Sequence, residues 1–310
     1  MTRRRPRPPK GPRRPAGGLG APPLTTLDEF SEQSVGAWLR AAANLQSLHA
    51  ALHFGLEAQR GRVSAELTSA LLAGASRSLG LKGWSRIVDY RYSLAPLSAR
   101  GSLTGDGGRF NIGEHLNPAS FTAFPALYVG EDYETAFAEK FGRTPEQAID
   151  GLSPAELALR TEASFTHVSL HGRIDIVLDI SSDDAMAPFV DIIRKFHVPF
   201  EAMQRARQLG VKPPSIVRSL DMLRATLTDP NWLRAPMQFD LPANSQVFGR
   251  IVAAAGIHGI LYPSIRLPGK QCLALFPQNW AASDSYVEVT DAVPEQARFT
   301  RLTADTPFID

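Results

Sequence analysis

The sequence predicts an α+β protein with a mixed β core, to which a helical region at the N-terminal side and a helical insertion are added. Hydrophobic residues make up 44% and charged residues 21% of the 310 residues, which is typical of soluble globular domains. Apolar residues recur at helical intervals early in the chain, and short apolar runs separated by glycine and proline follow from Trp84 onward. Strands and helices do not alternate regularly enough for a doubly wound parallel sheet.

Residues 1–23 are predicted to form a disordered tail, because proline, glycine and arginine dominate and little can be buried. Seven positive charges precede the first acidic residue, Asp28, so the formal net charge of +2 conceals a mildly acidic body. A solubilising leader is the simpler interpretation of the tail, and loose contact with nucleic acid is the alternative. No apolar stretch follows the arginines and no run of about 18 apolar residues occurs elsewhere, so we expect a cytoplasmic protein without a membrane segment.

Residues 24–83 are predicted to be helical. Thr26 and Glu29 suit a capping box, and the apolar residues that follow from Val35 are spaced for one long helix. A second helix is predicted over residues 63–72, before a break at Gly80–Gly83. His49 and His53 are spaced to face one metal ion, but no carboxylate or cysteine joins them nearby. We therefore interpret them as ordinary helix histidines and predict no metal site.

Residues 84–310 are predicted to form the main domain. The sequence predicts strands over 126–129, 174–180, 259–262 and 272–276, and a helix over 133–141. A helical insertion is predicted over about 184–235, with helices across 187–227 that are interrupted at Gly210 and at Pro213–Pro214. The only cysteine, Cys272, lies in an apolar run and is assigned to packing.

A glycine-rich loop over residues 101–111 is the first candidate for a binding site. Its four glycines would let backbone N–H groups approach a ligand, and Arg109 could donate two hydrogen bonds to one phosphate or pyrophosphate. The loop is neither a Walker motif nor a dinucleotide-binding fingerprint, because the required lysine and the strand-then-helix context are missing. A glycine-rich surface turn is an equally good interpretation of the composition alone.

Tyr128 and Glu139 are the second candidate. Strand alternation places Leu127 and Val129 on one face and Tyr128 on the other, between small neighbours, so a flat ring such as nicotinamide could stack there. In the next helix Glu139 lies off the apolar stripe of Tyr133, Phe137 and Phe141. Its carboxylate is either solvated and paired with Arg143, or placed to stabilise a cationic sugar.

Ser264 is the third candidate, because it follows a buried strand that Pro263 ends, and strand ends often line sites. It could equally be a turn residue, and no GxSxG elbow marks it as an acyl-transfer nucleophile. None of these three signals is specific by itself.

Taken in order, these blocks resemble the RES domain, named for its arginine, glutamate and serine. The resemblance covers residues 84–280 and rests on Tyr90-Arg91-Tyr92, on Gly107-Gly108-Arg109-Phe110-Asn111, on the eleven-residue step from Tyr128 to Glu139, and on Tyr262-Pro263-Ser264. The added helices and a long segment over 112–124 depart from a compact RES domain.

The resemblance implies an ADP-ribosyltransferase-like fold and a toxin-like enzyme that cleaves the nicotinamide–ribose bond of NAD, with phosphate or water as the acceptor of ADP-ribose. It assigns catalysis to Arg109, Glu139 and Ser264, and NAD binding to Arg91, Tyr92, Arg109, Tyr128 and Ser264. NAD is then the substrate, no cofactor or metal is required, and inorganic phosphate is a candidate co-substrate. It further implies a helix-turn-helix antitoxin as partner, and a homo-oligomer is also conceivable.

Two other functions remain open at this point. An ADP-ribosyltransferase would pass the same sugar to a protein or nucleic acid instead of to water or phosphate. A non-catalytic interaction module would depend on the basic tail and the N-terminal helices, and its binding to nucleic acid would weaken with salt.

Overall fold

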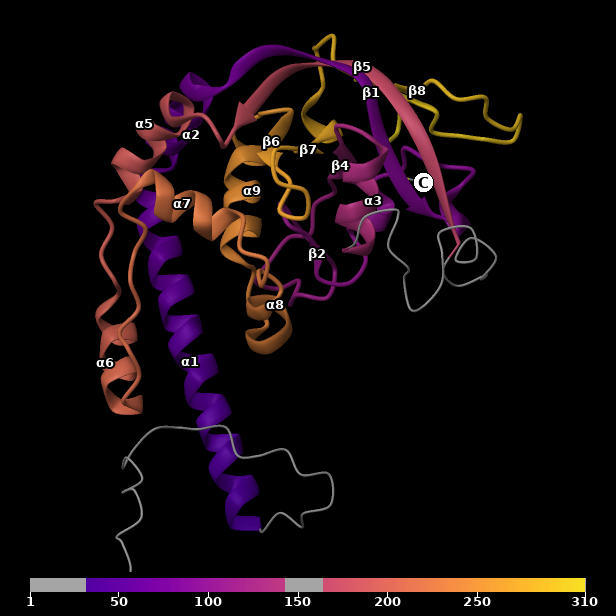
Figure 1. Ribbon diagram of the computed structural model, residues 1–310. Coiled ribbons are helices and arrows are strands. Elements are labelled where there is room, and N and C mark those ends of the chain that lie inside the picture. Colours follow the sequence, from indigo (N-terminus) through magenta and orange to yellow (C-terminus); the bar gives the residue numbers. More distant parts are fainter. Residues whose placement is uncertain (1–31, 143–163, 310) are drawn as a thin grey trace, which may run out of the picture.

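The core of the protein is a seven-stranded sheet that closes on itself (Figure 1). The computed structural model describes residues 32–142 and 164–309. The strand order is β1-β4-β7-β6-β5-β8-β9, and a further pairing between β1 and β5 joins the first and fifth strands of that order. Among the strands of the described residues, only β5 and β6 pair in parallel. The strands are β1 (Ser76–Asp89), β4 (Leu127–Gly130), β5 (Phe165–Asp179), β6 (Gly259–Pro263), β7 (Gln271–Leu275), β8 (Tyr286–Val289) and β9 (Arg301–Leu302). The α+β class is confirmed.

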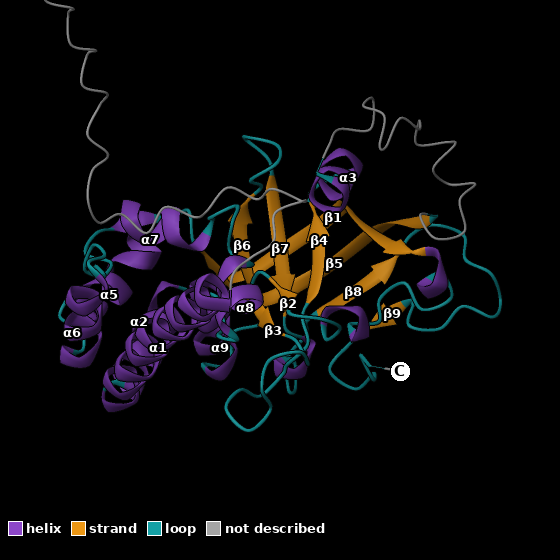
Figure 2. Ribbon diagram, turned by 90° about the horizontal axis from the view of Figure 1, so that it is seen from below, coloured by secondary structure: helices purple, strands orange, loops and turns teal. Residues whose placement is uncertain are grey.

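Helices cover one side of this sheet and one helix stands apart from them. Figures 1 and 2 show α1, α2, α5, α6 and α7 gathered together, whereas α3 lies alone beside β1 and β4. The helices are α1 (Glu32–Arg62), α2 (Ser64–Gly74), α3 (Tyr133–Phe141), α5 (Asp183–Ile193), α6 (Phe200–Leu209), α7 (Leu220–Leu227), α8 (Arg234–Phe239) and α9 (Asn244–Ala254). Short 3-10 turns lie at Tyr90–Tyr92, Arg100–Ser102 and Pro277–Asn279.

Two hydrophobic cores lie on the two faces of the sheet. One core joins the sheet to the helices and contains Phe110, Ala126, Phe189 and Phe248. The other fills the interior of the closed sheet and contains Leu127, Val129 and Trp280. Strand β4 therefore sends alternate residues into different cores, as its predicted alternation requires, with Tyr128 packed against the first core.

The predicted break at Gly80–Gly83 was wrong. These residues lie inside strand β1, which pairs antiparallel with β5 over almost its whole length. The register shifts between Lys82 and Trp84, and Gly83 has a φ of 71°, so the glycine sits in a bulge that bends the strand. Strand β5 likewise begins at Phe165, nine residues before the predicted start at Ile174, because its first half pairs with β1 and β8.

The other predicted elements are found close to their predicted bounds. The helix over 133–141 has the same bounds in the structure, and its aromatic stripe stacks along one face. The insertion contains helices α5, α6 and α7, and α6 ends at Gly210 as predicted. The basic tail, the proposed capping box of Thr26 and Glu29, and Arg143 lie outside the described residues.

Within residues 32–142 and 164–309, no helix combines the length and the apolarity that a bilayer span requires. The two histidines of α1 pack on aromatic rings. His49 stacks on Phe239 with ring centroids 3.8 Å apart, and His53 meets Phe121 edge to face at 5.4 Å.

Candidate active site

A cavity of about 340 Å³ lies where β1, β4, β6 and β7 meet helix α3 and the segment between α7 and α8. Its lining includes three of the predicted site residues, Arg109, Tyr128 and Glu139, which are scattered along the chain. Tyr262 and Cys272 are almost fully buried beside them, with 4% and 1% of their surfaces exposed. Further lining residues are Ser85, Arg86, Gly108, Ala136, Lys140, Pro230, Trp232, Leu233 and Arg266.

The carboxylate of Glu139 is held by the turn that follows β6. Ser264 Oγ donates to Glu139 Oε1 at 2.6 Å, and the Ile265 N–H donates to the same oxygen at 3.2 Å. The hydroxyl of Ser264 also accepts from the N–H groups of residues 266 and 267, at 3.2 and 3.0 Å, so its own proton is left for the carboxylate. Ser264 thus orients Glu139 through a hydrogen bond to a charged group.

Helix α3, which carries Glu139, is fixed to the hairpin that carries Ser264. Asp132 caps the helix, and its Oδ1 accepts from the Thr135 N–H at 2.8 Å and from the Thr135 hydroxyl at 2.6 Å. Its other oxygen accepts from Lys270 Nζ at 2.5 Å, and Lys270 also lies 2.9 Å from Glu131. Burial acts to raise the pKa of Asp132, but the hydrogen bonds from Lys270 and Thr135 outweigh it and lower that pKa.

Arg109 faces the cavity from the glycine-rich loop and joins that loop to the insertion. Its Nη1 donates to the carbonyl oxygens of Leu227 and Asp229, at 3.2 and 2.9 Å, and the guanidinium carbon lies 5.8 Å from the ring centre of Trp232. Burial lowers the pKa of Arg109, and Tyr262 and Glu139 oppose that shift. The side chain therefore remains a cation, 7% exposed, on the cavity wall.

The loop that presents Arg109 is framed by the polar side chains of half-buried Tyr128 and fully buried Asn111. Tyr128 accepts from the Phe110 N–H and donates to Asn111 Oδ1, both at 2.9 Å. A Cβ atom at Gly108 would lie 2.5 Å from the Tyr128 ring, so only glycine allows this approach. Burial raises the pKa of Tyr128, which stays a neutral donor. The long segment over 112–124 does not disturb this geometry, because Asn111 Nδ2 donates to Phe124 O at 2.9 Å.

Gln246, at the start of α9, supports the same loop from below. Its Nε2 donates to the carbonyl oxygens of Asp106, Gly108 and Asn111, at 2.7, 3.2 and 3.0 Å. Its Oε1 accepts from the Ala243 N–H at 2.9 Å. No signal in the sequence distinguished Gln246 from an ordinary helix residue, because its partners in the glycine-rich loop lie 135 to 140 positions away.

Arg86 is a site residue that the sequence analysis missed. It lines the cavity from β1, and its three nitrogens donate to backbone carbonyls, Nη1 to Tyr128 O at 2.8 Å, Nε to Pro96 O at 2.9 Å and Nη2 to Ser98 O at 3.1 Å. Burial lowers its pKa to about 10, so it is still a cation at neutral pH. An arginine inside the apolar stretch from Trp84 to Val88 was the signal that could have identified it.

Arg91 and Tyr92 do not line the cavity. Both lie in the 3-10 turn that follows β1, where the Arg91 side chain is 69% exposed, pairs with Asp89 at 3.5 Å and stacks over Tyr92 at 4.8 Å. Asp89 also binds Lys140, which does line the cavity, so Arg91 lies one ion pair away from it. Their predicted role in NAD binding stays a prediction. Cys272, in contrast, is buried among strands as predicted, and burial raises the pKa of its thiol.

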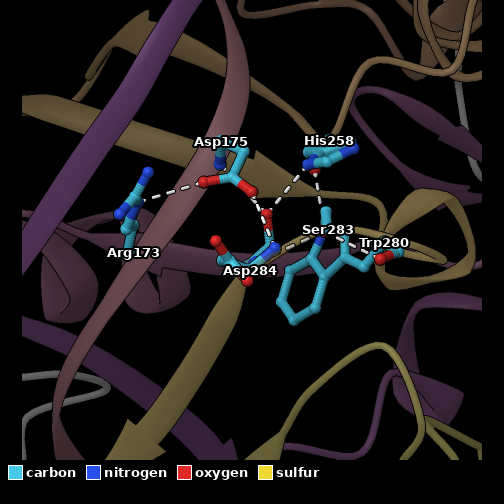
Figure 3. A network of polar contacts seen from close by, with 7 residues as sticks. Arg173, Asp175, His258, Trp280, Ser283 and Asp284 are labelled. Atoms are coloured by element: carbon cyan, nitrogen blue, oxygen red, sulfur yellow. Dashed lines mark hydrogen bonds and ion pairs between the residues drawn. The ribbon is translucent and has the colours of Figure 1, made fainter.

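A second polar cluster, drawn in Figure 3, braces the sheet away from the cavity. His258 Nδ1 lies 2.8 Å from Ser285 Oγ, which accepts from the Asp175 N–H at 3.0 Å. The Asp175 carboxylate accepts from the Asp284 N–H at 2.8 Å and from Arg173 Nε at 3.0 Å. His258 and Ser285, which directly precede β6 and β8, are only 4% and 1% exposed. They join the starts of these two strands to β5 and are closed to a substrate.

Comparison with known proteins gives one family and one solved structure. None of the curated proteins matches this sequence. A chain of the crystal structure of the M. tuberculosis MbcT–MbcA toxin–antitoxin complex is 14% identical, with a TM-score of 0.40, over 75% of this chain and 93% of that chain. The family model of the RES domain matches residues 83–210 and 185–300, which is more than half of the chain. The protein therefore belongs to the RES domain family.

Proposed function

We propose that this protein cleaves the nicotinamide–ribose bond of NAD and transfers ADP-ribose to water or to inorganic phosphate. The observation that carries the proposal is the oriented carboxylate of Glu139, which shares one cavity with a buried guanidinium, Arg109, and with the ring of Tyr128. Nicotinamide, ribose and pyrophosphate each have a matching group in that set. On this proposal the mixed core is of the ADP-ribosyltransferase kind.

Glu139 would stabilise the sugar cation. When the bond from ribose C1′ to the ring nitrogen breaks, its electron pair leaves with nicotinamide, which departs neutral, and positive charge develops on the ribose. A fixed carboxylate favours that charge more in the transition state than in the ground state. Only Oε1 of Glu139 is hydrogen-bonded within the described residues, which leaves Oε2 for the ribose hydroxyls. Ser264 acts here as a positioning residue.

The cations around the cavity would bind the anionic parts of the reaction. Arg109 is buried and Arg86 is half-buried, and both keep their charges, so either guanidinium can bind the pyrophosphate of NAD. Lys140 and Arg266 line the same cavity and would favour phosphate as acceptor. With water as acceptor the attacking oxygen loses its proton to solvent, and with phosphate the product is ADP-ribose 1″-phosphate.

The test is nicotinamide release from NAD by the full chain, in buffers with and without phosphate, after any bound protein has been stripped. We expect release by the wild type and a loss of about 100-fold or more in kcat for Glu139→Gln. Glu134→Gln is the matched control, because Glu134 is an exposed residue of the same helix. An inactive wild type in both buffers contradicts the proposal, and full activity of Glu139→Gln removes Glu139 from it.

The same reaction with labelled NAD distinguishes the acceptors. Label on ADP-ribose or its phosphate supports the proposal, whereas label on a protein or nucleic acid identifies a macromolecular ADP-ribosyltransferase. The resemblance to toxins extends the proposal to a cytoplasmic enzyme held inactive by a helix-turn-helix antitoxin. The test is to co-express the chain with a helix-turn-helix protein encoded by an adjacent gene and to repeat the release assay, in which the complex should release less nicotinamide than the chain alone.

A further inference from the structure

A second cavity, of about 380 Å³, adjoins the first at Trp232, which lines both. It lies between α1, the segment from α7 to α8, and the start of α9. We infer that this second cavity binds the adenosine half of NAD while the first holds the nicotinamide half. The inference rests on the proposed function, because it takes NAD as the substrate.

The sizes of the two cavities match a substrate with two halves. Ligand cavities usually range from about 300 to 1,000 Å³, and each of these two, at about 340 and 380 Å³, lies at the lower end. NAD consists of two nucleotides joined by a pyrophosphate, so neither cavity needs to contain the whole molecule. The Glu139 carboxylate fixes the nicotinamide ribose in the first cavity, which leaves the adenosine for the second.

The lining of the second cavity suits an adenine base. His49 stacks on Phe239 with an angle of 18° between the rings, and Trp232 adds another aromatic surface. Burial lowers the pKa of His49, so its ring is neutral and can lie against a base. Asn231 and Asn244 bring amides, which pair with the N6 and N7 edge of adenine.

Ser245 gives an independent indication of a ligand. It lines the second cavity and is 1% exposed, yet its Oγ has no hydrogen-bond partner within the part of the chain that the structure describes. Buried hydroxyls are normally hydrogen-bonded, and an unpartnered one calls for an absent group. A ribose hydroxyl or an adenine nitrogen would supply that partner, and Asp229 in the same lining could accept from the ribose.

The pyrophosphate would cross between the cavities at Arg109. Arg109 Nη1 donates to the carbonyl of Asp229 at 2.9 Å, and its guanidinium faces the ring of Trp232. Asp229 and Trp232 both belong to the second cavity as well. Arg109 therefore lies at the junction, where the two phosphates must pass. Arg234 adds a second positive charge to the lining of the second cavity.

The kinetic test compares NAD with nicotinamide mononucleotide, which has the same scissile bond but lacks the adenosine half. In the Asn244→Ala variant we expect kcat/KM for NAD to fall about tenfold relative to that for the mononucleotide, mainly through KM. Asn244 is exposed at the first turn of α9, so the exchange does not disturb the core. Arg207→Ala, at an exposed position of α6, is the control and should change neither value.

A binding test needs no turnover. Calorimetry with AMP should show saturable binding to the wild type. Ser245→Leu, which fills the cavity, should abolish that binding, and circular dichroism checks that this variant is folded. If it is not folded, AMP binding is measured in Asn244→Ala instead and should be weakened. The inference is overturned if the ratio of kcat/KM for NAD to kcat/KM for the mononucleotide is unchanged in Asn244→Ala, or if the wild type does not bind AMP. AMP binding without nicotinamide release from either substrate would instead refute the proposed function and leave the adenosine site standing.

Discussion

The two walls of the active-site cavity are built in different ways. On the sheet side, Glu139 and Ser264 are held by a helix cap, a turn and the pairing of β6 with β7, all local to the closed sheet. On the insertion side, Pro230, Trp232 and Leu233 line the cavity, and the guanidinium of Arg109 joins the glycine-rich loop to the insertion through the carbonyls of Leu227 and Asp229.

This difference suits the sheet wall to catalysis and the insertion wall to the selection of substrates. A group that must stabilise charge within a few tenths of an ångström needs rigid neighbours on all sides, which the sheet wall supplies. A surface that selects among substrates needs only the right shape and aromatic contacts, which a loop between two short helices can supply and change more easily. Substitutions on the sheet wall should therefore lower kcat, and those on the insertion wall should change KM.

The largest expected effect is on stability, at Gln246, which supports the glycine-rich loop between the two walls. Gln246→Leu should lower the free energy of unfolding by about 3 kcal/mol, because it removes a hydrogen-bond donor from three loop carbonyls that are buried or partly buried. Urea unfolding followed by circular dichroism measures it, with exposed Gln204→Leu on α6 as control. A loss below about 1 kcal/mol would mean that water replaces the amide and that Gln246 does not hold the glycine-rich loop in place.

Ser264→Ala tests the sheet wall alone. We expect kcat for nicotinamide release to fall about 10- to 100-fold with KM nearly unchanged, because the variant removes the hydroxyl's hydrogen bond to the Glu139 carboxylate. It also removes the two hydrogen bonds that the hydroxyl accepts within its own turn, while the Ile265 N–H still donates to Glu139. Ser283→Ala is matched to it, since that hydroxyl donates within a turn to Trp280 O at 2.7 Å. A rise in KM without a fall in kcat would assign Ser264 to ground-state binding instead.

How much could be predicted from the sequence follows the same division. The sheet wall was predictable because its residues stand in short motifs at fixed spacing: the step from Tyr128 to Glu139 crosses one strand and one helix, and Ser264 directly follows β6. The long strand β1 was not, because Gly80 and Gly83 argue for a turn unless the pairing with β5 is known. Residues 24–83 are accordingly less purely helical than predicted, with strand from Ser76.

The insertion wall could not be predicted at all. Its helices were expected from apolar spacing, but which of its residues reach the cavity depends on a crossing of chain segments about 120 positions apart, as in the contacts of Arg109 with Leu227 and Asp229. Arg86 was missed for a related reason. An arginine is expected to be exposed, and only the three backbone carbonyls around Arg86 explain why it is half-buried at the cavity.

A smaller effect is expected at the cap of α3. Asp132→Ala should lower the free energy of unfolding by about 1 kcal/mol, the usual value of a lost N-cap, whereas Asp132→Asn keeps the cap and should lose less. The folded-state pKa of Asp132 is lowered from 3.8, so its contribution is complete above that pH and is lost as the pH falls below it. Thermal unfolding of both variants between pH 3 and 7 measures this, and equal losses in the two variants at pH 7 would assign the effect to the ion pair with Lys270.

The effect that is smallest at neutral pH concerns the helical region and should leave the cavity untouched. Burial lowers the pKa of His53 to about 4, although Glu57 acts to raise it, and Arg60 and Arg250 add to the lowering. The unfolded chain, with an ordinary histidine pKa near 6.5, then binds the proton more readily than the folded chain does. The free energy of unfolding should therefore fall as the pH drops from about 6.5 to 4.

The variant His53→Gln tests this, because that part of the fall should disappear when the histidine is absent. His115→Gln is the control and should keep the fall, since the His115 side chain is 70% exposed. An identical pH profile for His53→Gln and the wild type would show that burial does not lower the pKa of His53 in the folded protein.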